Sequence, residues 1–254
     1  MENTWPKRIA RHMQNEQWAQ DQMGMSHATV FLGRSLVLKC EPDSAEARNE
    51  AQMYAFLQGK LPVPQVVDAF CENGVHYLLL HRAQGVMACD PARLASPEKT
   101  VALLAQGLLL LRETPIAGCP CTQFAADKLR RARENLDAGD VSIADAEPAT
   151  YGKGGFKDPE ALWRYLSAHQ PDETPCMTHG DYCLPNVFLH GGAVSALIDL
   201  GRAGVGDRWQ DIALCARSIR HNFGADYTDL LLGCLGVAPD PERMNWYLLL
   251  DELF

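Results

Sequence analysis

Two short apolar segments joined by a pair of glycines constrain the fold of this chain more than any other feature. VFLH at 187–190 and AVSALI at 193–198 flank the dipeptide Gly-Gly. Paired glycines between two such segments predict a two-residue β-hairpin, because the favoured turns require positive φ, which glycine adopts without steric penalty. A hairpin is therefore expected near the middle of the C-terminal half of the chain.

The turn decides which residues meet at the open end of this hairpin. In the simplest register His190 lies opposite Ala193, so Asn186 lies opposite Leu197. Asn186 and Asp199 should then leave the hairpin at the same end. An amide oxygen and a carboxylate suit a hard cation such as Mg²⁺, whose other sites are filled by water and phosphate oxygens. We interpret Asn186 and Asp199 as candidate metal ligands.

A further aspartate precedes the hairpin in the segment HGDYCLPN. Asp181 lies five residues before Asn186, close enough to meet a hydroxyl presented to a metal-bound phosphate, so it is the candidate catalytic base. The intervals of five and thirteen residues from Asp181 to Asn186 and on to Asp199 also occur in the protein-kinase template. The alternative is an Asx turn, a cap and a helix start without catalytic function. We interpret His179 as structural and Cys183 as a spectator thiol.

A core-facing carboxylate in the first third provides a second test. Residues 44–57 predict a helix that begins at Asp43 or Ser44, and Glu50 falls on its inward face. A buried carboxylate without a partner is destabilising by several kcal/mol. Lys39, at the end of the apolar segment SLVLKC, is the natural partner. A plain structural ion pair, or a Glu50 side chain that reaches solvent, is the alternative.

The first third alternates short apolar segments with turns, whereas the rest has helical periods. Two hairpins of a mainly antiparallel sheet are predicted, 27–33 with 35–40 and 65–71 with 76–81. Further helices are expected at 96–111, 123–136, 158–168, 208–220 and from about 239, with a long loop over 137–157. We predict an α+β fold of two lobes, 1–84 and 86–254, with a hinge near 81–85.

Composition excludes several functional classes. The formal net charge of −9 argues against a nucleic-acid surface and mildly favours cationic ligands. The N-terminus resembles no signal peptide and no apolar run could cross a membrane, so we expect a cytoplasmic protein without a membrane partner. Nine cysteines without a CxxC pair are expected to be reduced and mostly in the core. Metalloprotease, GxSxG and complete Walker A motifs are absent from the sequence.

With these residues in place, the chain resembles the aminoglycoside phosphotransferases, and most of all the 3'-phosphotransferases, or kanamycin kinases. The resemblance covers nearly the whole chain and includes GMSHATVF, LQGKLPVPQV, FKDPEAL, THGDYCLPN, IDLGRAGVGDRWQDIAL, ARSIR and LLLDELF. It implies a protein-kinase-like bilobal fold. It also implies Mg²⁺-dependent transfer of the γ-phosphate of ATP or GTP to the 3'-hydroxyl of kanamycin- or neomycin-type aminoglycosides, which confers antibiotic resistance.

The resemblance also implies roles on the nucleotide side. Lys39 would hold the α and β phosphates, and Glu50 would orient Lys39. Ser26, in a loop just before a strand, would lie over the phosphates, where backbone amides and a hydroxyl can meet anions. The hinge backbone near His81 and Ala83 would contact the purine.

On the acceptor side, the resemblance implies that Asp181 positions the hydroxyl while Asn186 and Asp199 bind Mg²⁺. The residues expected near the antibiotic are Arg202, Arg217, Asp251, Glu252 and Phe254. Two acids and the terminal carboxylate within four residues could dock a polyammonium sugar, although a solvated acidic tail is the alternative. Loop acids Asp140, Asp145 and Glu147 could add to this field.

Some positions depart from the family pattern. Val37 stands where an aromatic residue often stacks on the purine, which leaves ATP or GTP open. His221 and Asn222 replace acidic residues after ARSIR, and Glu113 replaces a histidine, which leaves the antibiotic spectrum open. A kinase of another small alcohol or metabolite, and a nucleotide-binding scaffold without catalysis, are the alternatives. A monomer and a homodimer both fit the sequence.

Overall fold

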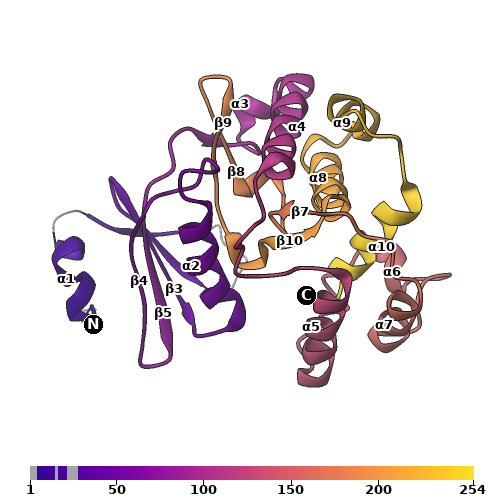
Figure 1. Ribbon diagram of the computed structural model, residues 1–254, viewed down its shortest axis with the longest axis horizontal. Coiled ribbons are helices and arrows are strands. Elements are labelled where there is room, and N and C mark those ends of the chain that lie inside the picture. The colour runs from indigo at the N-terminus through magenta and orange to yellow at the C-terminus, as the bar shows by residue number, and fades with distance from the viewer. Residues whose placement is uncertain (1–4, 15–16, 22–27) are drawn as a thin grey trace.

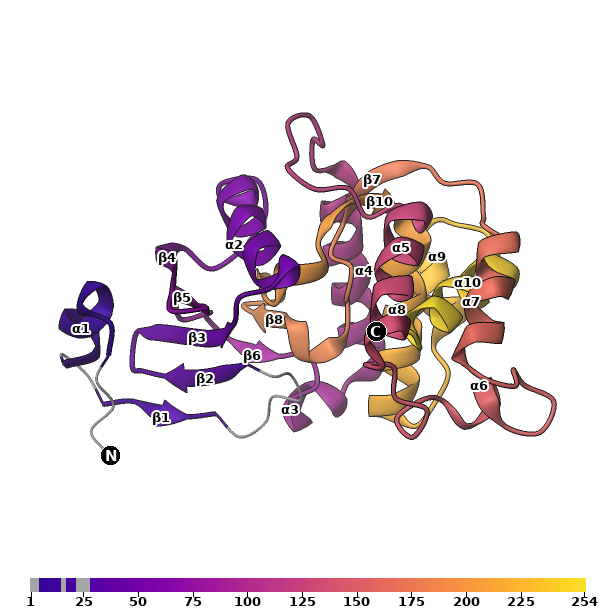
Figure 2. The same ribbon diagram turned by 90° about the horizontal axis from the view of Figure 1, so that it is seen from below.

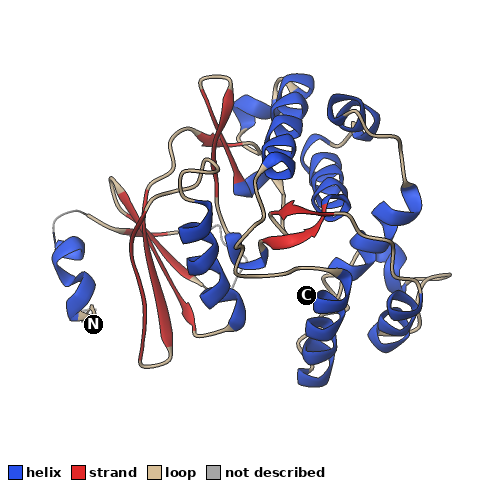
Figure 3. Ribbon diagram, viewed as in Figure 1, coloured by secondary structure: helices blue, strands red, loops and turns tan. Residues whose placement is uncertain are grey.

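The computed structural model describes residues 5–14, 17–21 and 28–254. An antiparallel sheet lies at one end of the molecule, and the helices α7 (Pro159–Ala168) and α10 (Pro241–Asp251) lie at the other (Figures 1 and 2). Figure 3 shows the same division by secondary structure, with strands concentrated in the N-terminal part and helices in the C-terminal part. The predicted α+β architecture is therefore confirmed.

The N-terminal sheet has five strands in the order β1-β2-β3-β5-β4, all paired antiparallel. Its strands are β1 (Ala19–Gln20), β2 (Thr29–Leu32), β3 (Leu36–Pro42), β4 (Val66–Glu72) and β5 (Val75–His81). Both predicted hairpins are present, because β2 pairs with β3 and β4 pairs with β5.

Each face of this sheet packs against one helix. On β5, Leu79 belongs to the cluster beneath α1 (Lys7–Gln14), whereas Leu78 and Leu80 belong to the main core with α2 (Ala45–Leu57). Side chains of a strand alternate between its faces, so consecutive leucines serve different helices. Ser44 accepts a hydrogen bond from Ala47 N–H at 3.0 Å and caps α2 as predicted.

The C-terminal part is mainly helical. Its further helices are α3 (Pro91–Leu94), α4 (Pro97–Glu113), α5 (Ala125–Ala138), α6 (Pro148–Tyr151), α8 (Arg208–Phe223) and α9 (Thr228–Leu235). Its strands are β6 (Val86–Met87), β7 (Pro175–Thr178), β8 (Val187–His190), β9 (Ala193–Leu197) and β10 (Gly204–Asp207), with single 3₁₀ turns η1 (Leu184–Asn186) and η2 (Leu200–Arg202). No helix in the described ranges is long and apolar enough to span a membrane.

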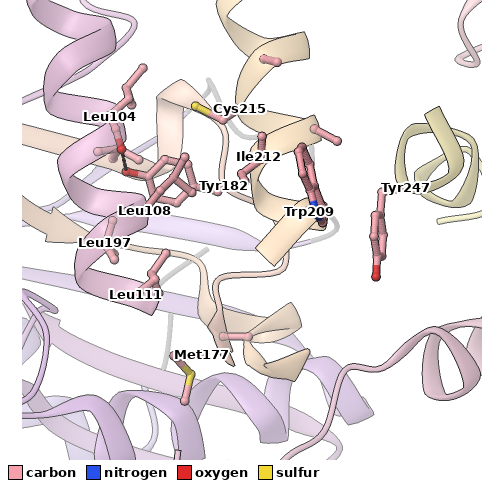
Figure 4. Packing of buried hydrophobic residues seen from close by; sticks show 14 of the residues in the cluster. Leu104, Leu108, Leu111, Met177, Tyr182, Leu197, Trp209, Ile212, Cys215 and Tyr247 are labelled. Atoms are coloured by element: carbon pink, nitrogen blue, oxygen red, sulfur yellow. Dashed lines mark hydrogen bonds between the residues drawn. The ribbon is translucent and has the colours of Figure 1, made fainter. Parts of the chain in front are cut away.

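The core of this part anchors the loop that carries Asp181. Tyr182, the next residue, is fully buried, and its hydroxyl donates to the carbonyl of Leu104 on α4 at 2.9 Å (Figure 4). A Cβ at Gly107 would collide with that hydroxyl, so the glycine leaves the space that the Tyr182 side chain fills. The apolar face predicted for α4 is buried, and it fixes one side of the Asp181 loop.

The register predicted for the β8–β9 hairpin is wrong by one residue. Val187, not Asn186, lies opposite Leu197, because the pairing shifts between Phe188 and Leu189. The extra residue on β9 is Ser195, whose hydroxyl donates to Gln84 O in the hinge at 2.6 Å. The bulge brings Asn186 beside Ile198, one position nearer to Asp199 than expected.

Three other predictions are confirmed only in part or lie outside the described residues. The 137–157 loop contains the end of α5 and the short helix α6, and α9 was not predicted. All nine cysteines are free thiols, as expected. Cys176 and Cys215 are buried, and four more are half-buried against the hydrophobic clusters, namely Cys40, Cys89, Cys119 and Cys121. The segment before β2 that includes Ser26 lies outside the described residues.

Candidate active site

Lys39 connects the two parts of the molecule. Leu36 and Leu38 face α1, so the alternation of β3 turns Lys39 to the other face, toward α2. Its Nζ atom lies 2.8 Å from Glu50 Oε2 and 3.0 Å from Asp199 Oδ1. Lys39 therefore contacts a helix of the N-terminal part and a loop of the C-terminal part at once.

The Lys39 cluster is largely buried. The Glu50 side chain is only 2% exposed. Burial lowers the pKa of Lys39, but its carboxylate neighbours, Glu50 first, outweigh this and raise it above its ordinary value. Burial raises the pKa of Asp199, yet the Lys39 ammonium outweighs burial and brings it below the ordinary value. Lys39 and Asp199 are therefore both charged at neutral pH. The carboxylate predicted to face the core has the partner predicted for it.

Asp199 has an unusual backbone conformation. Its φ of 61° and ψ of 62° lie in the left-handed region, which is unfavourable for a residue with a Cβ. Its N–H donates to the Tyr54 hydroxyl at 3.3 Å, and its carboxylate contacts Lys39. Such conformations persist only where neighbours hold them and are concentrated at functional sites.

Asp181 and Asn186 contact each other directly. The Asn186 amide nitrogen donates to the Asp181 backbone carbonyl at 3.0 Å and to Asp181 Oδ2 at 2.9 Å. Gly180, just before, has a φ of 84°, and a Cβ there would collide with the Arg202 carbonyl oxygen. Glycine is therefore required at 180, and the loop is held in one conformation.

Asp211 on α8 holds the same loop and was not found from the sequence. It accepts the backbone N–H groups of His179 at 2.7 Å and Gly180 at 2.8 Å. Burial raises the pKa of Asp211, while these hydrogen bonds oppose the rise. An aspartate on an otherwise apolar helix face was the signal available in the sequence, because a buried acid needs partners.

His179 has the structural position that we predicted. It is fully buried, and its Nε2 lies 3.0 Å from the Ile198 carbonyl oxygen. The Asp181 N–H donates to His179 Nδ1 at 3.3 Å. The imidazole thus links the Asp181 loop to the residue that precedes Asp199.

The donor set at the open end of the hairpin fits Mg²⁺. Ile198 N–H donates to Asn186 O at 3.0 Å, which places Asn186 beside Asp199 in the sheet. Because the Asn186 amide nitrogen faces Asp181, its oxygen faces the other way. Within the described ranges no group of three or more His, Cys, Asp or Glu side chains could hold a metal. An ion held by Asn186 and Asp199 would need phosphate and water oxygens, as Mg²⁺ usually does.

The C-terminal acids are paired rather than solvated. Asp251 accepts hydrogen bonds from Arg202, at 3.4 Å, and from Arg217. Glu252 lies 3.7 Å from Arg217 and accepts the Glu147 N–H at 3.1 Å. The side chains of Asp251 and Glu252 are 19% and 7% exposed, so a freely solvated acidic tail is excluded.

A cavity of about 870 Å³ opens beside this cluster, and we call it the acceptor cavity. Its charged lining residues are Glu41, Glu46, Asp140, Asp145, Glu147, Arg202, Arg217, Asp251 and Glu252. They include Asp140, Asp145 and Glu147, the three loop acids that were predicted to add to the negative charge near the substrate. Burial and the nearby Asp251 raise the pKa of Asp181, and Arg202 opposes them, so Asp181 lies within electrostatic reach of the cavity wall.

Two backbone N–H groups of the predicted hinge are already hydrogen-bonded within the protein. The His81 N–H donates to Gln65 O at 2.8 Å, and the Arg82 N–H donates to Ser35 O at 2.8 Å. A purine contact at His81 would therefore have to use its carbonyl oxygen. Ala83, the other residue predicted to contact the purine, lies two residues after the end of β5.

The sequence and the geometry agree with a known family. A model of the phosphotransferase enzyme family matches residues 17–247. The chain belongs to this family. Proteins named aminoglycoside 3'-phosphotransferase from Enterococcus faecalis and Staphylococcus aureus are 36% and 37% identical to it over 92% of each chain. The crystal structure of an aminoglycoside-3'-phosphotransferase of type VIII superposes with a TM-score of 0.83 at 25% identity, covering 97% of both chains.

In this phosphotransferase the predicted residues form two groups. Lys39, Glu50 and Asp199 make one set of contacts, and Asp181 with Asn186 makes another, joined through His179. A second group on the acceptor side comprises Arg202, Arg217, Asp251, Glu252 and Phe254, whose ring lies 5.1 Å from the Arg202 guanidinium carbon. Glu41 and Glu46, from the N-terminal part, line the acceptor cavity and were not predicted to do so.

Proposed function

We propose that this phosphotransferase moves the γ-phosphate of a nucleoside triphosphate to the 3'-hydroxyl of an aminoglycoside. The observation that carries the proposal is the acceptor cavity, in which seven acidic side chains oppose two arginines, and one of these, Arg202, has its backbone against Gly180 of the Asp181 loop. A polyammonium sugar is attracted by such an excess of negative charge. The names of the relatives point to the same substrate class and the same hydroxyl.

Asp181 would orient the acceptor hydroxyl and accept its proton. Its raised pKa suits this role, because a carboxylate that is a stronger base takes up a proton more readily. Asn186 donates to one Asp181 oxygen, which fixes the direction of the carboxylate. Orientation of this kind supplies much of the rate enhancement in phosphoryl transfer.

Lys39 would contact the phosphates of the donor, in an orientation held by Glu50. Asn186 and Asp199 would hold Mg²⁺, which neutralises charge on the phosphates when it is bound. Lys39, whose Nζ lies 3.0 Å from Asp199 Oδ1, would then also contact the phosphates of the incoming nucleotide. His81 and Ala83 would receive the purine through the hinge backbone, and Ser26 would lie over the phosphates.

The transfer needs no reactant other than the acceptor and the nucleoside triphosphate. The acceptor oxygen forms a bond to the γ-phosphorus as the bond from that phosphorus to the bridging oxygen breaks, and the nucleoside diphosphate leaves. The hydroxyl proton passes to Asp181 and then to solvent. The modified antibiotic carries a dianionic group in place of a hydroxyl, which accounts for resistance. Because ATP and GTP are cytoplasmic, the reaction is expected in the cytoplasm.

Mass spectrometry of the acceptor tests the proposal. The purified protein would be incubated with Mg²⁺, ATP or GTP, and kanamycin or neomycin, with choline as a competing small alcohol. Addition of about 80 Da, the mass of one phosphoryl group, to the antibiotic is expected, with phosphorus NMR to assign the 3' position. Transfer to choline alone would favour the other small-alcohol kinase. Nucleotide binding without any product would favour the scaffold.

A further inference from the structure

A second cavity adjoins the acceptor cavity. It has a volume of about 780 Å³ and shares Glu147, Arg217 and Glu252 with its neighbour. Its walls come from the segment that contains α6, from α7, from the end of α8 and from α10. These helices lie together at the end of the molecule away from the sheet (Figure 2). We call this space the outer pocket.

The boundary between the two cavities is fixed. Glu252, a residue of both linings, is held by Arg217 at 3.7 Å and by the Glu147 N–H at 3.1 Å. Its side chain is only 7% exposed. A molecule longer than the acceptor cavity would therefore pass this paired acid to enter the outer pocket.

The outer pocket differs in charge from the acceptor cavity. Its acids, Glu147 and Glu252, are matched in number by Arg217 and Arg220, and His221 adds a further base. Arg217 already pairs with acids, whereas no ion pair of Arg220 is found within the described ranges. The apolar and aromatic residues of its lining are Phe156, Tyr165, Leu248 and Leu249. An ammonium group would therefore meet a guanidinium here and no excess of carboxylates.

We propose that the outer pocket binds the outermost ring of the acceptor and selects an uncharged, hydroxylated ring over an amine-bearing one. The inference rests on the proposed aminoglycoside kinase activity and deepens it. Arg220 can donate hydrogen bonds to hydroxyl oxygens and repels ammonium groups. Arg220 and His221 are thus specificity-determining residues, outside the machinery of phosphoryl transfer.

Three acceptors of increasing length test the inference. Neamine has two amine-bearing rings, ribostamycin adds an uncharged ribose, and neomycin adds a further ring with two amines. For the unmodified protein, KM should fall from neamine to ribostamycin and should not fall further with neomycin. In Arg220→Glu, which reverses a charge, KM for neomycin should fall about tenfold, and in His221→Asp, which adds one exposed charge, it should fall no more than about fivefold, while kcat and the KM for neamine stay unchanged.

The matched control is Arg164→Glu. Arg164 on α7 is 72% exposed and lines neither cavity, so its reversal makes the same change in net charge at another place. Arg220 also lies in the last turn of α8, where a cation stabilises the helix dipole. Arg220→Gln, which removes the charge without reversing it, and a Tm for each variant separate this structural role from specificity.

Two failures are distinguishable. If none of the three acceptors is phosphorylated by the unmodified protein, the proposed function is wrong. If neamine is phosphorylated but the ratio of KM values for neomycin and neamine is the same in Arg220→Glu, His221→Asp and Arg164→Glu, the outer pocket does not select the outer ring and the inference alone is wrong.

Discussion

The nucleotide side and the acceptor side of this active site are built in different ways. On the nucleotide side, Lys39 meets Glu50 and Asp199 within 3.0 Å, and regular elements position two of the three residues. On the acceptor side, seven acids and two arginines surround about 870 Å³, and several of the acids come from a long connection. Transfer chemistry needs fixed distances between few atoms, whereas attraction of a polycation needs an excess of charge. Single substitutions should therefore have much larger effects on the first side.

Removal of the proposed base should have the largest effect. Asp181→Asn keeps the shape and the contact with Asn186 but cannot accept the hydroxyl proton. We expect kcat to fall by roughly 10²- to 10⁴-fold, the usual contribution of general base catalysis, while nucleotide affinity stays within a factor of two or so. Steady-state kinetics with kanamycin and calorimetric titration of the nucleotide would measure both quantities. Near-normal turnover would remove Asp181 from the chemistry and with it the contrast between the two sides.

Disruption of the Lys39 cluster should rank second. Lys39→Met removes the proposed phosphate contact and leaves Glu50 buried without its cation. KM for ATP should therefore rise, and the free energy of unfolding should fall. We expect kcat/KM for ATP to fall by about 10- to 150-fold, which corresponds to a charged hydrogen bond of about 1.5–3 kcal/mol. The double variant Lys39→Met with Glu50→Gln should recover part of the stability, since Glu50, the most buried carboxylate beside Lys39, is then neutral, but it should not recover activity.

One result for the double variant would contradict the proposed role of Lys39 in phosphate binding. Recovery of ATP turnover together with stability would mean that the Lys39–Glu50 contact is only a structural ion pair, which is the alternative that the sequence left open. Thermal unfolding and initial rates measured on the same samples would decide between the two.

Local periodicity explains why the contact between Lys39 and Glu50 could be predicted from the sequence. Lys39 follows the two-residue period of a strand and Glu50 the helical period of α2, so each direction depends on nearby residues. The register of the β8–β9 hairpin could not be predicted in the same way, because the bulge is held by Ser195 and the distant Gln84. Asp211 was missed for the same reason, since its partners lie 31 and 32 residues earlier in the chain.

The acceptor side was predicted less completely. The C-terminal acids were found, but their arginine partners reach them from η2 and α8, and no local pattern reports these pairs. Glu41 and Glu46 enter the cavity from the N-terminal part, so their role depends on how the sheet is placed on the helices. Functions that rest on contacts between distant segments therefore need the structure.

Asp251 should have an intermediate effect, because it belongs to the acceptor side but is fixed like the nucleotide side. Asp251→Asn leaves Arg202 and Arg217 without their shared carboxylate and makes the cavity less negative. We expect KM for kanamycin to rise about tenfold, which is close to 1.4 kcal/mol, while KM for ATP changes little. A similar rise of both KM values would show that the cluster holds the whole active site together and does not serve the acceptor alone.

Loss of a single exposed loop acid should have the smallest effect. Asp145 lines the acceptor cavity from the surface, and exposed charges contribute only about 0–1 kcal/mol to an interaction. Asp145→Asn should therefore raise KM for kanamycin no more than about fivefold, and added salt should remove the difference because it screens exposed charges. Asp172→Asn, which removes another exposed acid outside the acceptor cavity, is the control. A loss of tenfold or more that persists in high salt would mean that Asp145 binds an ammonium group directly, and the acceptor side would then also depend on fixed contacts.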